Sequence, residues 1–295
     1  ALGAHVEEKE NTVHITTGPE GLHGARIFFD LVSVGATINV LLAAVKAKGL
    51  TIMENVAREP EIVDLATFLN NMGAHIRGAG TNEIRIQGVD SLKSMNVHTI
   101  IPDRIEAGTY LSFAAANGNG VLVKNVITEH LDPFLSKLEE MGVRMEIDED
   151  EIYVPGGDVL SPVNIKTSPF PGFATDLQQP ITPLLMQARG SSTIIDTLYP
   201  ERTKHIPEMQ RMGAKISSKD GIITVGHSTD LSGTVVEAGE IRAGVSLVGL
   251  ALMAKGTTVI NKADNILRGY DRIVEKFRGL SVDLEVINES ESLNH

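Results

Sequence analysis

Apolar and polar positions repeat along the chain with a period of about seventy residues. In the clearest copy, residues 36–95, an apolar helix is followed by a glycine, a strand, a polar loop, a second helix and a strand hairpin. Glycines mark the same two places in successive copies: Gly49, Gly120, Gly190 and Gly256 before the first strand, and Gly3, Gly73, Gly142 and Gly213 after the second helix. Ser281 takes the second place in the last copy. The pattern therefore predicts an array of large α/β units.

The two helices of each unit differ in polarity. The first is apolar almost all round, as in LSFAAANG and GVSLVGLALMA, which is typical of a buried helix, whereas the second is amphipathic. We therefore expect α/β domains with Ala-rich helices inside and sheets outside. The predicted domains are residues 1–98, and residues 99–295 with three units that begin near Glu106, Thr175 and Arg242; residues 96–104 would cross between them.

The first residues match only the tail of a unit, because LGAHVEEKENTVHI aligns with MGAHIRGAGTNEIRI without a helix before it. We expect from this that the first domain is incomplete and that a missing N-terminal segment of the same protein belongs with the chain.

Composition narrows the possible partners. A net charge of −12 argues against nucleic acid, which is held by clustered Lys and Arg. The chain has no cysteine, so thiolate metal sites and disulfides are excluded, and its histidines show no metal-binding spacing. The longest apolar runs are too short to span a bilayer. We expect a cytoplasmic protein that needs neither a membrane, a metal nor a cofactor.

Two sets of loops differ most between units, and such loops usually carry function. One set begins the apolar helix: residues 33–35, 106–109, 175–176 and 242–244. Free backbone N–H groups at a helix start bind anions, although for any single loop taken alone ordinary capping by Ser, Thr or Asp is the favoured explanation. The other set follows the strand: residues 58–61, 129–130, 201–205 and 268–270.

Arginines gather in these loops although the protein is acidic. Arginine suits bidentate contact with carboxylate and phosphate, although salt bridges are a fair explanation for Arg58 and Arg104. For Arg242 and Arg268 we favour ligand contact because glycines flank both. Asp176 begins an apolar helix, where it caps the helix or serves as a general base.

The stretches LVSVGAT, AREPEIVD, PDRIEAGT, FATDLQQP, ERTKH and LRGYDRI occur in an order that resembles the UDP-N-acetylglucosamine 1-carboxyvinyltransferase family. The resemblance covers residues 1–288. It implies the inside-out α/β barrel of enolpyruvyl transferases, and transfer of enolpyruvyl from phosphoenolpyruvate to the 3′-hydroxyl of UDP-N-acetylglucosamine at the start of peptidoglycan synthesis.

The resemblance also implies roles for individual residues. Catalysis would fall to Asp176, as the base that accepts the sugar hydroxyl proton, and to Arg268. Phosphoenolpyruvate would be held by Arg242, Arg268 and Arg202. The UDP-sugar would contact Leu31, Val32, Ser33, Val34, Gly35, Asp176 and Leu198, although some relatives carry a lysine in place of Leu31.

Parts of the family's site have no counterpart in this sequence. The family's loop with an acidic cysteine is absent, so the chain lacks that proton donor for the enolpyruvyl methylene. We expect the chain alone to be inactive or nearly so, because a lost general acid costs about a hundredfold to ten-thousandfold.

Three alternatives stay open. A 5-enolpyruvylshikimate-3-phosphate synthase shares fold and donor, but the LVSVGAT and AREPEIVD stretches argue against it. A non-catalytic UDP-sugar-binding fragment would bind the nucleotide sugar without turnover. A purely structural repeat protein is disfavoured by the arginine-bearing loops.

Overall fold

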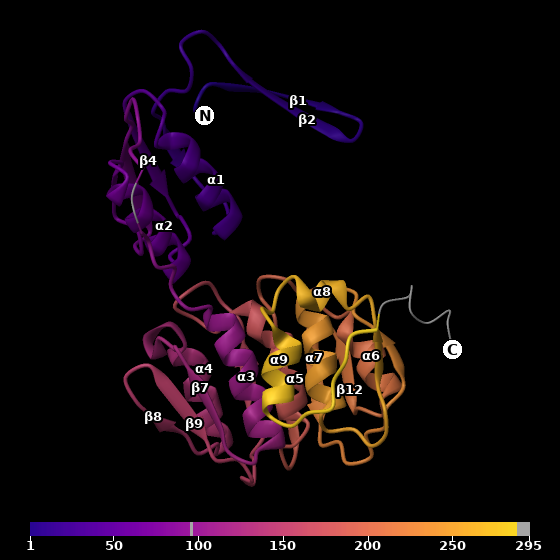
Figure 1. The fold of residues 1–295 in the computed structure, drawn as a ribbon. Helices are drawn as coiled ribbons and strands as arrows, with labels where there is room; N and C mark the ends of the chain where they lie inside the picture. Colours follow the sequence, from indigo (N-terminus) through magenta and orange to yellow (C-terminus); the bar gives the residue numbers. More distant parts are fainter. Residues whose placement is uncertain (95–96, 288–295) are drawn as a thin grey trace. The chain divides into compact units, whose positions relative to one another are not determined.

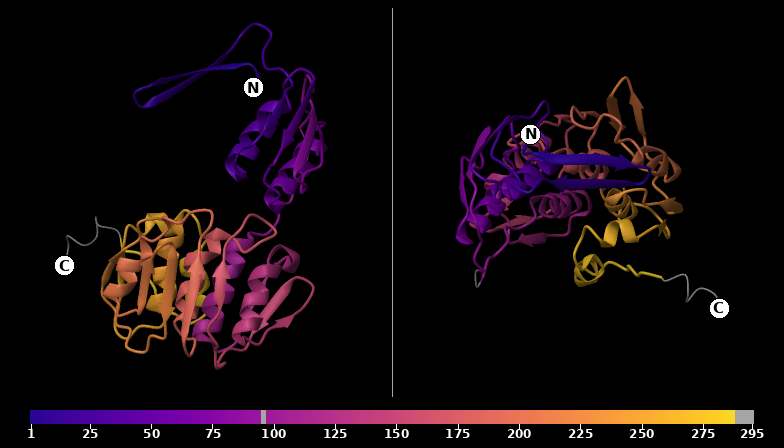
Figure 2. Two further views of the ribbon diagram at one scale, coloured as in Figure 1. Left: turned by 180° about the vertical axis from the view of Figure 1, so that it is seen from behind. Right: turned by 90° about the horizontal axis from the view of Figure 1, so that it is seen from above.

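A computed structural model describes residues 1–94 and 97–287 (Figures 1 and 2). By its contacts the chain divides into two compact units, residues 1–101 with 169–171, and residues 102–168 with the chain from Gly172 onward. The predicted crossing begins at residue 96, which lies outside the described residues. Whether residues 1–98 and 99–295 fold as separate domains stays a prediction.

The first unit contains a free hairpin and one four-stranded sheet. Its elements are β1 (Ala4–Lys9), β2 (Thr12–Thr17), β3 (Arg26–Phe28), α1 (Val34–Ala44), β4 (Leu50–Glu54), α2 (Pro60–Asn71), β5 (His75–Arg77) and β6 (Glu83–Gln87). The sheet order is β3-β4-β6-β5, with β3 parallel to β4 and the other pairs antiparallel. As the sequence predicts, Pro60 stands in the first turn of α2, where its missing N–H leaves no helical hydrogen bond unmade.

In this unit the prediction of a fully buried first helix is wrong. Helix α1 buries only Thr37, Leu41 and Ala44, while Leu42 stays 46% exposed. One stripe of the helix packs into a core with Met53 and Ile84, and the described residues do not cover its other faces.

The second unit holds three repeats. Its strands are β7 (Val121–Lys124), β8 (Glu146–Ile147), β9 (Glu151–Val154), β10 (Asn164–Lys166), β11 (Ser191–Ile195), β12 (Ile216–Lys219), β13 (Ile222–Gly226), β14 (Val235–Glu237) and β15 (Val259–Asn261). Its helices are α3 (Arg104–Asn117), η1 (Thr128–His130), α4 (Asp132–Met141), η2 (Thr175–Leu177), α5 (Gln178–Leu185), α6 (His205–Arg211), α7 (Ile241–Ala251), α8 (Asp264–Leu267) and α9 (Ile273–Gly279). The sheets run β7-β9-β8, β10-β11-β13-β12 and β14-β15.

Helices α3, α5 and α7 lie side by side at the centre of this unit, and the strands lie outside them (Figures 1 and 2). Every residue of α5 is buried, and α7 is buried from Ala243 to Leu250. Small residues allow the close approach: a Cβ atom added to Gly249 of α7 would lie 2.2 Å from the Phe113 ring of α3. Buried helices under outer sheets are therefore confirmed for this unit.

The repeated glycines after the second helices have a conformational reason. Gly73, Gly142 and Gly213 have φ values of +99°, +89° and +91°, the left-handed region that favours glycine at helix ends. Ser281 takes the same region, with φ of +63°. The period read from the sequence thus reflects a backbone requirement at each helix end.

Candidate active site

Three of the predicted site residues come together at one end of the central helices. Asp176 lies in η2 directly before α5, Arg202 lies in the loop after β11, and Arg242 lies in the first turn of α7. Arg202 Nη1 is 2.5 Å from Asp176 Oδ1, and Arg242 Nη2 is 3.4 Å from Asp176 Oδ2. Two guanidinium groups from different repeats therefore converge on one carboxylate, one on each oxygen.

The electrostatics of this cluster favour an ionised aspartate. Burial alone would raise the pKa of Asp176, but the hydrogen bond from Arg202 and the charges of Arg242 and Arg202 outweigh it and hold the pKa below its ordinary value. The side chain of Asp176 stays 36% exposed, so the carboxylate is still accessible from solvent. The site therefore offers fixed positive charge next to a proton acceptor.

Asp196 at the end of β11 organises the loop that carries Arg202. This carboxylate is 4% exposed and accepts hydrogen bonds from Thr175 Oγ1 at 2.6 Å and from Thr167 Oγ1 at 2.8 Å. It also accepts the backbone N–H groups of Leu198 and Tyr199. Asp196 thereby ties the Arg202 loop to the start of α5.

Tyr199 supports Arg202 from one side. The Arg202 guanidinium lies 4.4 Å from the centre of the Tyr199 ring, within the range of a cation–π interaction. Arg202 Nη1 is also 3.4 Å from Thr175 Oγ1.

Arg242 is held by a different tyrosine. Its Nη1 donates to Tyr270 Oη at 3.0 Å, and Tyr270 Oη is 3.1 Å from Thr109 Oγ1 of α3. Burial would lower the pKa of Arg242, but Tyr270 and Asp176 outweigh this effect and raise it above its ordinary value. Arg242 therefore stays charged.

Arg268 does not join this cluster. It follows α8, is exposed, and makes no side-chain hydrogen bond or ion pair with any described residue. The adjacent Gly269 packs so tightly on Ile241 that an added Cβ would lie 2.5 Å from its side chain. This packing places the Arg268 loop beside the first turn of α7, next to Arg242.

The remaining predicted contacts are divided between the two units. Leu198 is half-buried in the Arg202 loop, whereas the stretch Leu31 to Gly35 belongs to the first unit. Ser33 there accepts the Ala36 N–H at 3.3 Å as the cap of α1, and Leu31 is 80% exposed. The capping explanation thus holds for Ser33, and nucleotide contact by this stretch stays a prediction.

Two of the predicted loops lie wholly within α-helices, and one of them is residues 242–244 at the start of α7. Residues 106–109 lie inside α3, whose first turn begins at Arg104 and is capped by Asp103 accepting the Ile105 N–H at 2.8 Å. The Asp before the helix is the stronger start signal, because its carboxylate satisfies N–H groups that Glu106 cannot reach. Thr109 therefore points into the core, where it meets Tyr270.

Sequence reasoning missed Asp196, and it included Thr109 and Tyr270 only as members of the loops 106–109 and 268–270, without a role for either. Asp196 carried one available signal, a charged residue that ends an apolar strand. Tyr270 lies in a loop singled out for its arginine, but nothing in the sequence says that its hydroxyl faces Arg242.

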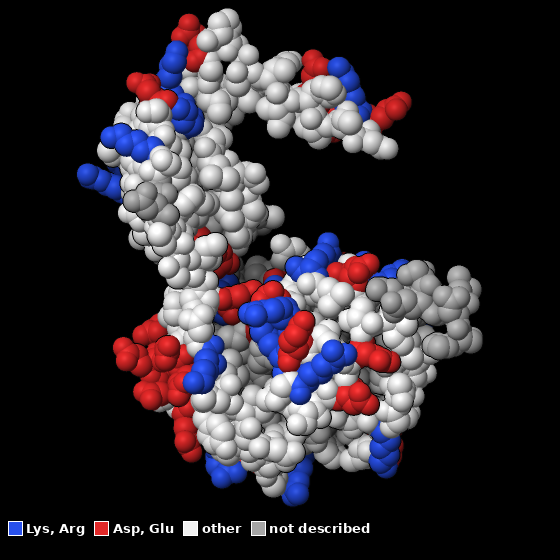
Figure 3. All heavy atoms as spheres, in the orientation of Figure 1, with Lys and Arg blue, Asp and Glu red and all other residues white. Residues whose placement is uncertain are grey.

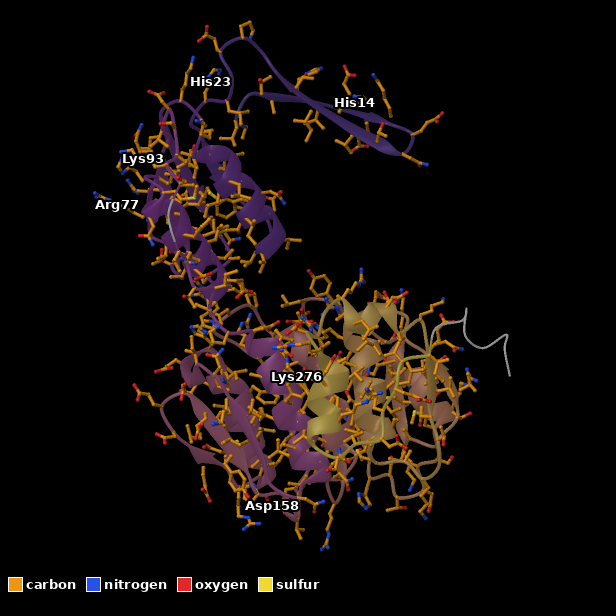
Figure 4. The ribbon with its side chains drawn as sticks, in the orientation of Figure 1. His14, His23, Arg77, Lys93, Asp158 and Lys276 are labelled. Carbon is orange, nitrogen blue, oxygen red and sulfur yellow. The ribbon has the colours of Figure 1, made fainter. Side chains whose placement is uncertain are left out.

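A cavity of about 680 Å³ lies elsewhere in the second unit, between α3, β7 and α9. Its lining includes three aromatic side chains, Tyr110, Phe113 and Phe277, and no member of the Asp176 cluster. Two charged residues also line it, and Lys276 Nζ donates to Glu106 Oε1 at 2.6 Å; Lys276 is labelled in Figure 4. We therefore do not place the candidate site in this cavity.

Charge on the visible face is mixed (Figure 3). Over the second unit on that face, acidic side chains gather near the turn between β8 and β9 and basic and acidic side chains are mixed elsewhere, so this face shows no broad basic surface of the kind that binds nucleic acid. Among residues 1–94 and 97–287, no group of three His, Cys, Asp or Glu side chains could hold a metal ion. In the same residues, no helix has the length and apolar character of a membrane span.

The fold is shared with solved enolpyruvyl transferases. The enolpyruvyl transferase NikO from Streptomyces tendae matches with a TM-score of 0.87 and 25% identity, over 96% of this chain and 69% of that chain. An EPSP synthase from Acinetobacter baumannii matches in fold with a TM-score of 0.71, at 19% identity over 97% of this chain and 70% of that chain. A model of the EPSP synthase (3-phosphoshikimate 1-carboxyvinyltransferase) family matches residues 1–277. Fold and site thus define the class as enolpyruvyl transferases.

Relatives within this class narrow the assignment. UDP-N-acetylglucosamine 1-carboxyvinyltransferase 2 of Lactiplantibacillus plantarum is 61% identical over 99% of this chain and 68% of its own length. UDP-N-acetylglucosamine 1-carboxyvinyltransferase of Lactobacillus johnsonii is 57% identical over 98% of this chain and 69% of its own length. The chain belongs to the UDP-N-acetylglucosamine 1-carboxyvinyltransferase family.

Proposed function

We propose that this chain contributes to the transfer of the enolpyruvyl group from phosphoenolpyruvate to the 3′-hydroxyl of UDP-N-acetylglucosamine, with release of phosphate. The observation that carries the proposal is the convergence of Arg202 and Arg242 on Asp176. High identity to relatives named for this reaction supports the choice of substrates.

The two arginines suit the donor. Phosphoenolpyruvate carries a carboxylate and a phosphate, and guanidinium groups bind both kinds of anion through paired N–H donors. Arg242 is held in place by Tyr270, and Arg202 by the Tyr199 ring. Positive groups fixed in this way stabilise the anionic oxygens of the transition state with little reorganisation. Arg268, exposed on the neighbouring loop, would add a third contact when the donor is bound.

Asp176 suits the acceptor. The oxygen of the sugar 3′-hydroxyl bonds to C2 of the enolpyruvyl group. As this bond forms, the 3′-hydroxyl gives its proton to the Asp176 carboxylate, and a second proton adds to C3. Loss of a proton from C3 and departure of phosphate from C2 then restore the double bond. The donor's anionic groups share the positive charge of the two fixed arginines, which offsets their lowering of the Asp176 pKa and strengthens Asp176 as a base.

Other assignments belong to the same proposal. Leu31 to Gly35 and Leu198 would contact the UDP-sugar, and the process would be peptidoglycan synthesis in the cytoplasm. A preceding segment of the same protein would supply the proton donor to C3, because this sequence contains no cysteine. Turnover by the chain alone would then be about a hundredfold to ten-thousandfold slower than turnover by a protein that includes the proton donor to C3.

Calorimetric titration tests this proposal. We expect the chain to bind UDP-N-acetylglucosamine and phosphoenolpyruvate but not shikimate 3-phosphate. Asp176→Asn should weaken binding of UDP-N-acetylglucosamine about tenfold, because a charge-assisted hydrogen bond is lost. Phosphate release, measured in the same samples, should be slow or undetectable.

The matched control is Asp220→Asn, in an exposed turn where φ is +53° and asparagine is well tolerated. It should leave binding unchanged. Binding of shikimate 3-phosphate without binding of UDP-N-acetylglucosamine would contradict the proposal and favour the synthase alternative. Rapid phosphate release by the chain alone would remove the need for a further proton donor.

A further inference from the structure

A chain of hydroxyl groups runs from Arg242 into the core of the second unit. Arg242 Nη1 is 3.0 Å from Tyr270 Oη, Tyr270 Oη is 3.1 Å from Thr109 Oγ1, and Thr109 Oγ1 is 2.7 Å from the carbonyl oxygen of Ile105. Both hydroxyl-bearing residues are buried, with exposed fractions of 1% for Tyr270 and 0% for Thr109. The chain joins α7, the loop after α8, and α3.

The direction of these hydrogen bonds follows from the donors available. A carbonyl oxygen can only accept, so the Thr109 hydroxyl donates its one proton to Ile105. The Tyr270 hydroxyl must then donate to Thr109, and its lone pairs accept the N–H of Arg242. Each proton therefore has one place, and the last acceptor is a backbone carbonyl of a buried helix.

This arrangement restrains the guanidinium plane. Nη1 of Arg242 is committed to Tyr270, and the guanidinium carbon lies 5.5 Å from the centre of the Tyr270 ring. Nη2 is left to face the carboxylate of Asp176. Loss of the tyrosine hydroxyl would free the guanidinium to rotate, because Asp176 contacts it only at 3.4 Å.

We infer that Tyr270 and Thr109 are positioning residues for Arg242: they hold its guanidinium in the orientation that receives the anionic donor. The inference rests on the proposed function, in which Arg242 binds phosphoenolpyruvate. Both residues are buried and act through Arg242. Burial raises the pKa of Tyr270, which agrees with a hydroxyl that stays protonated and keeps donating to Thr109.

The first test needs no ligand. In arginine-labelled protein, with Arg242 assigned through Arg242→Lys, nuclear magnetic resonance should show separate Nη signals because rotation of the guanidinium is slow. Tyr270→Phe and Thr109→Val should merge these signals, whereas Thr109→Ser keeps the hydroxyl and should keep them apart. Tyr153→Phe, on β9, is the matched control.

The second test measures affinity for phosphoenolpyruvate by calorimetry. Tyr270→Phe and Thr109→Val should each weaken binding about three- to tenfold, the double variant no more than Tyr270→Phe alone, and Thr109→Ser little. A substitution that only lowers the free energy of unfolding would leave the affinity of the folded protein unchanged. Urea unfolding of the same variants measures that free energy separately.

The outcomes separate the two claims. Unchanged Arg242 signals and unchanged affinity in Tyr270→Phe would overturn the inference. If the unmodified chain does not bind phosphoenolpyruvate, yet its Arg242 signals merge in Tyr270→Phe and Thr109→Val, the restraint is real and the proposed function is wrong.

Discussion

At the scale of single residues, His205 is a buried side chain whose hydrogen bonding requires the neutral form of its ring. It is fully buried, and its Nδ1 lies 3.2 Å from Nε2 of Gln179, which also donates to Glu240 Oε1 at 2.9 Å. An amide nitrogen can only donate, so Nδ1 of His205 accepts and the ring is neutral. Burial lowers the pKa of His205 to about 4, from an ordinary value of 6.5.

This shift predicts a pH dependence of stability. His205 binds a proton near pH 6.5 in the unfolded chain and only near pH 4 in the folded chain. The contribution of neutral His205 to the free energy of unfolding is therefore full above pH 6.5 and is lost as pH falls toward 4. The loss amounts to about 3 kcal/mol in the free energy of unfolding. His205→Asn keeps a hydrogen-bond acceptor but does not titrate. The free energy of unfolding of this variant should therefore fall less than that of the unmodified chain between pH 6.5 and pH 4.

Urea unfolding of both proteins between pH 7 and pH 4 measures the difference, since the shared carboxylates cancel. Parallel curves for the two proteins would show that His205 is not buried in its neutral form.

A residue of the site could be predicted from the sequence when its position relative to a helix or strand indicated its role, and could not when its role depended on packing between distant segments. Asp176, Arg202 and Arg242 could be named because charged residues at helix starts and post-strand loops are visible in the sequence. Tyr270 and Thr109 are 161 positions apart, so their hydrogen bond exists only through the packing of the helices. Arg268 is predicted together with the others, but its side chain is exposed and makes no hydrogen bond with any described residue, so its role stays a prediction.

At the scale of elements, the order of helices and strands was predictable because positive-φ glycines and apolar helices recur together. The hairpin β1–β2 and the second helices α2, α4, α6 and α9 appear where the pattern expects them. The exposure of α1 was not predictable, because an apolar helix is buried only if neighbours cover it.

Helix packing in the second unit gives a prediction of its own. Gly249→Ala should lower the free energy of unfolding by about 2 kcal/mol, because the added methyl would lie 2.2 Å from the Phe113 ring. Gly279→Ala, in α9, meets no atom within 4 Å and should stabilise by about 0.5 kcal/mol. Urea unfolding compares the two. Equal effects of both substitutions would show that α7 and α3 are less closely packed than described.

At the scale of the whole molecule, an acidic protein gathers positive charge at one place. The net charge is −12, yet Arg202 and Arg242 meet around Asp176, and Arg268 lies on an adjacent loop. In the proposed function, an anionic donor therefore depends on these local guanidinium groups, because the total charge is negative. The sequence repeat explains this arrangement, because successive repeats of the second unit bring loops with different side chains to the same end of the central helices.

The most direct measurement is the affinity of the chain for phosphoenolpyruvate in arginine variants, by calorimetry. Arg242→Gln and Arg202→Gln should each weaken binding at least tenfold, because each removes a charge-assisted contact to the donor. Arg211→Gln, at an exposed arginine of α6, should leave affinity unchanged. If phosphoenolpyruvate binds equally well to all three variants, Arg202 and Arg242 do not hold the donor and the account of the site is wrong.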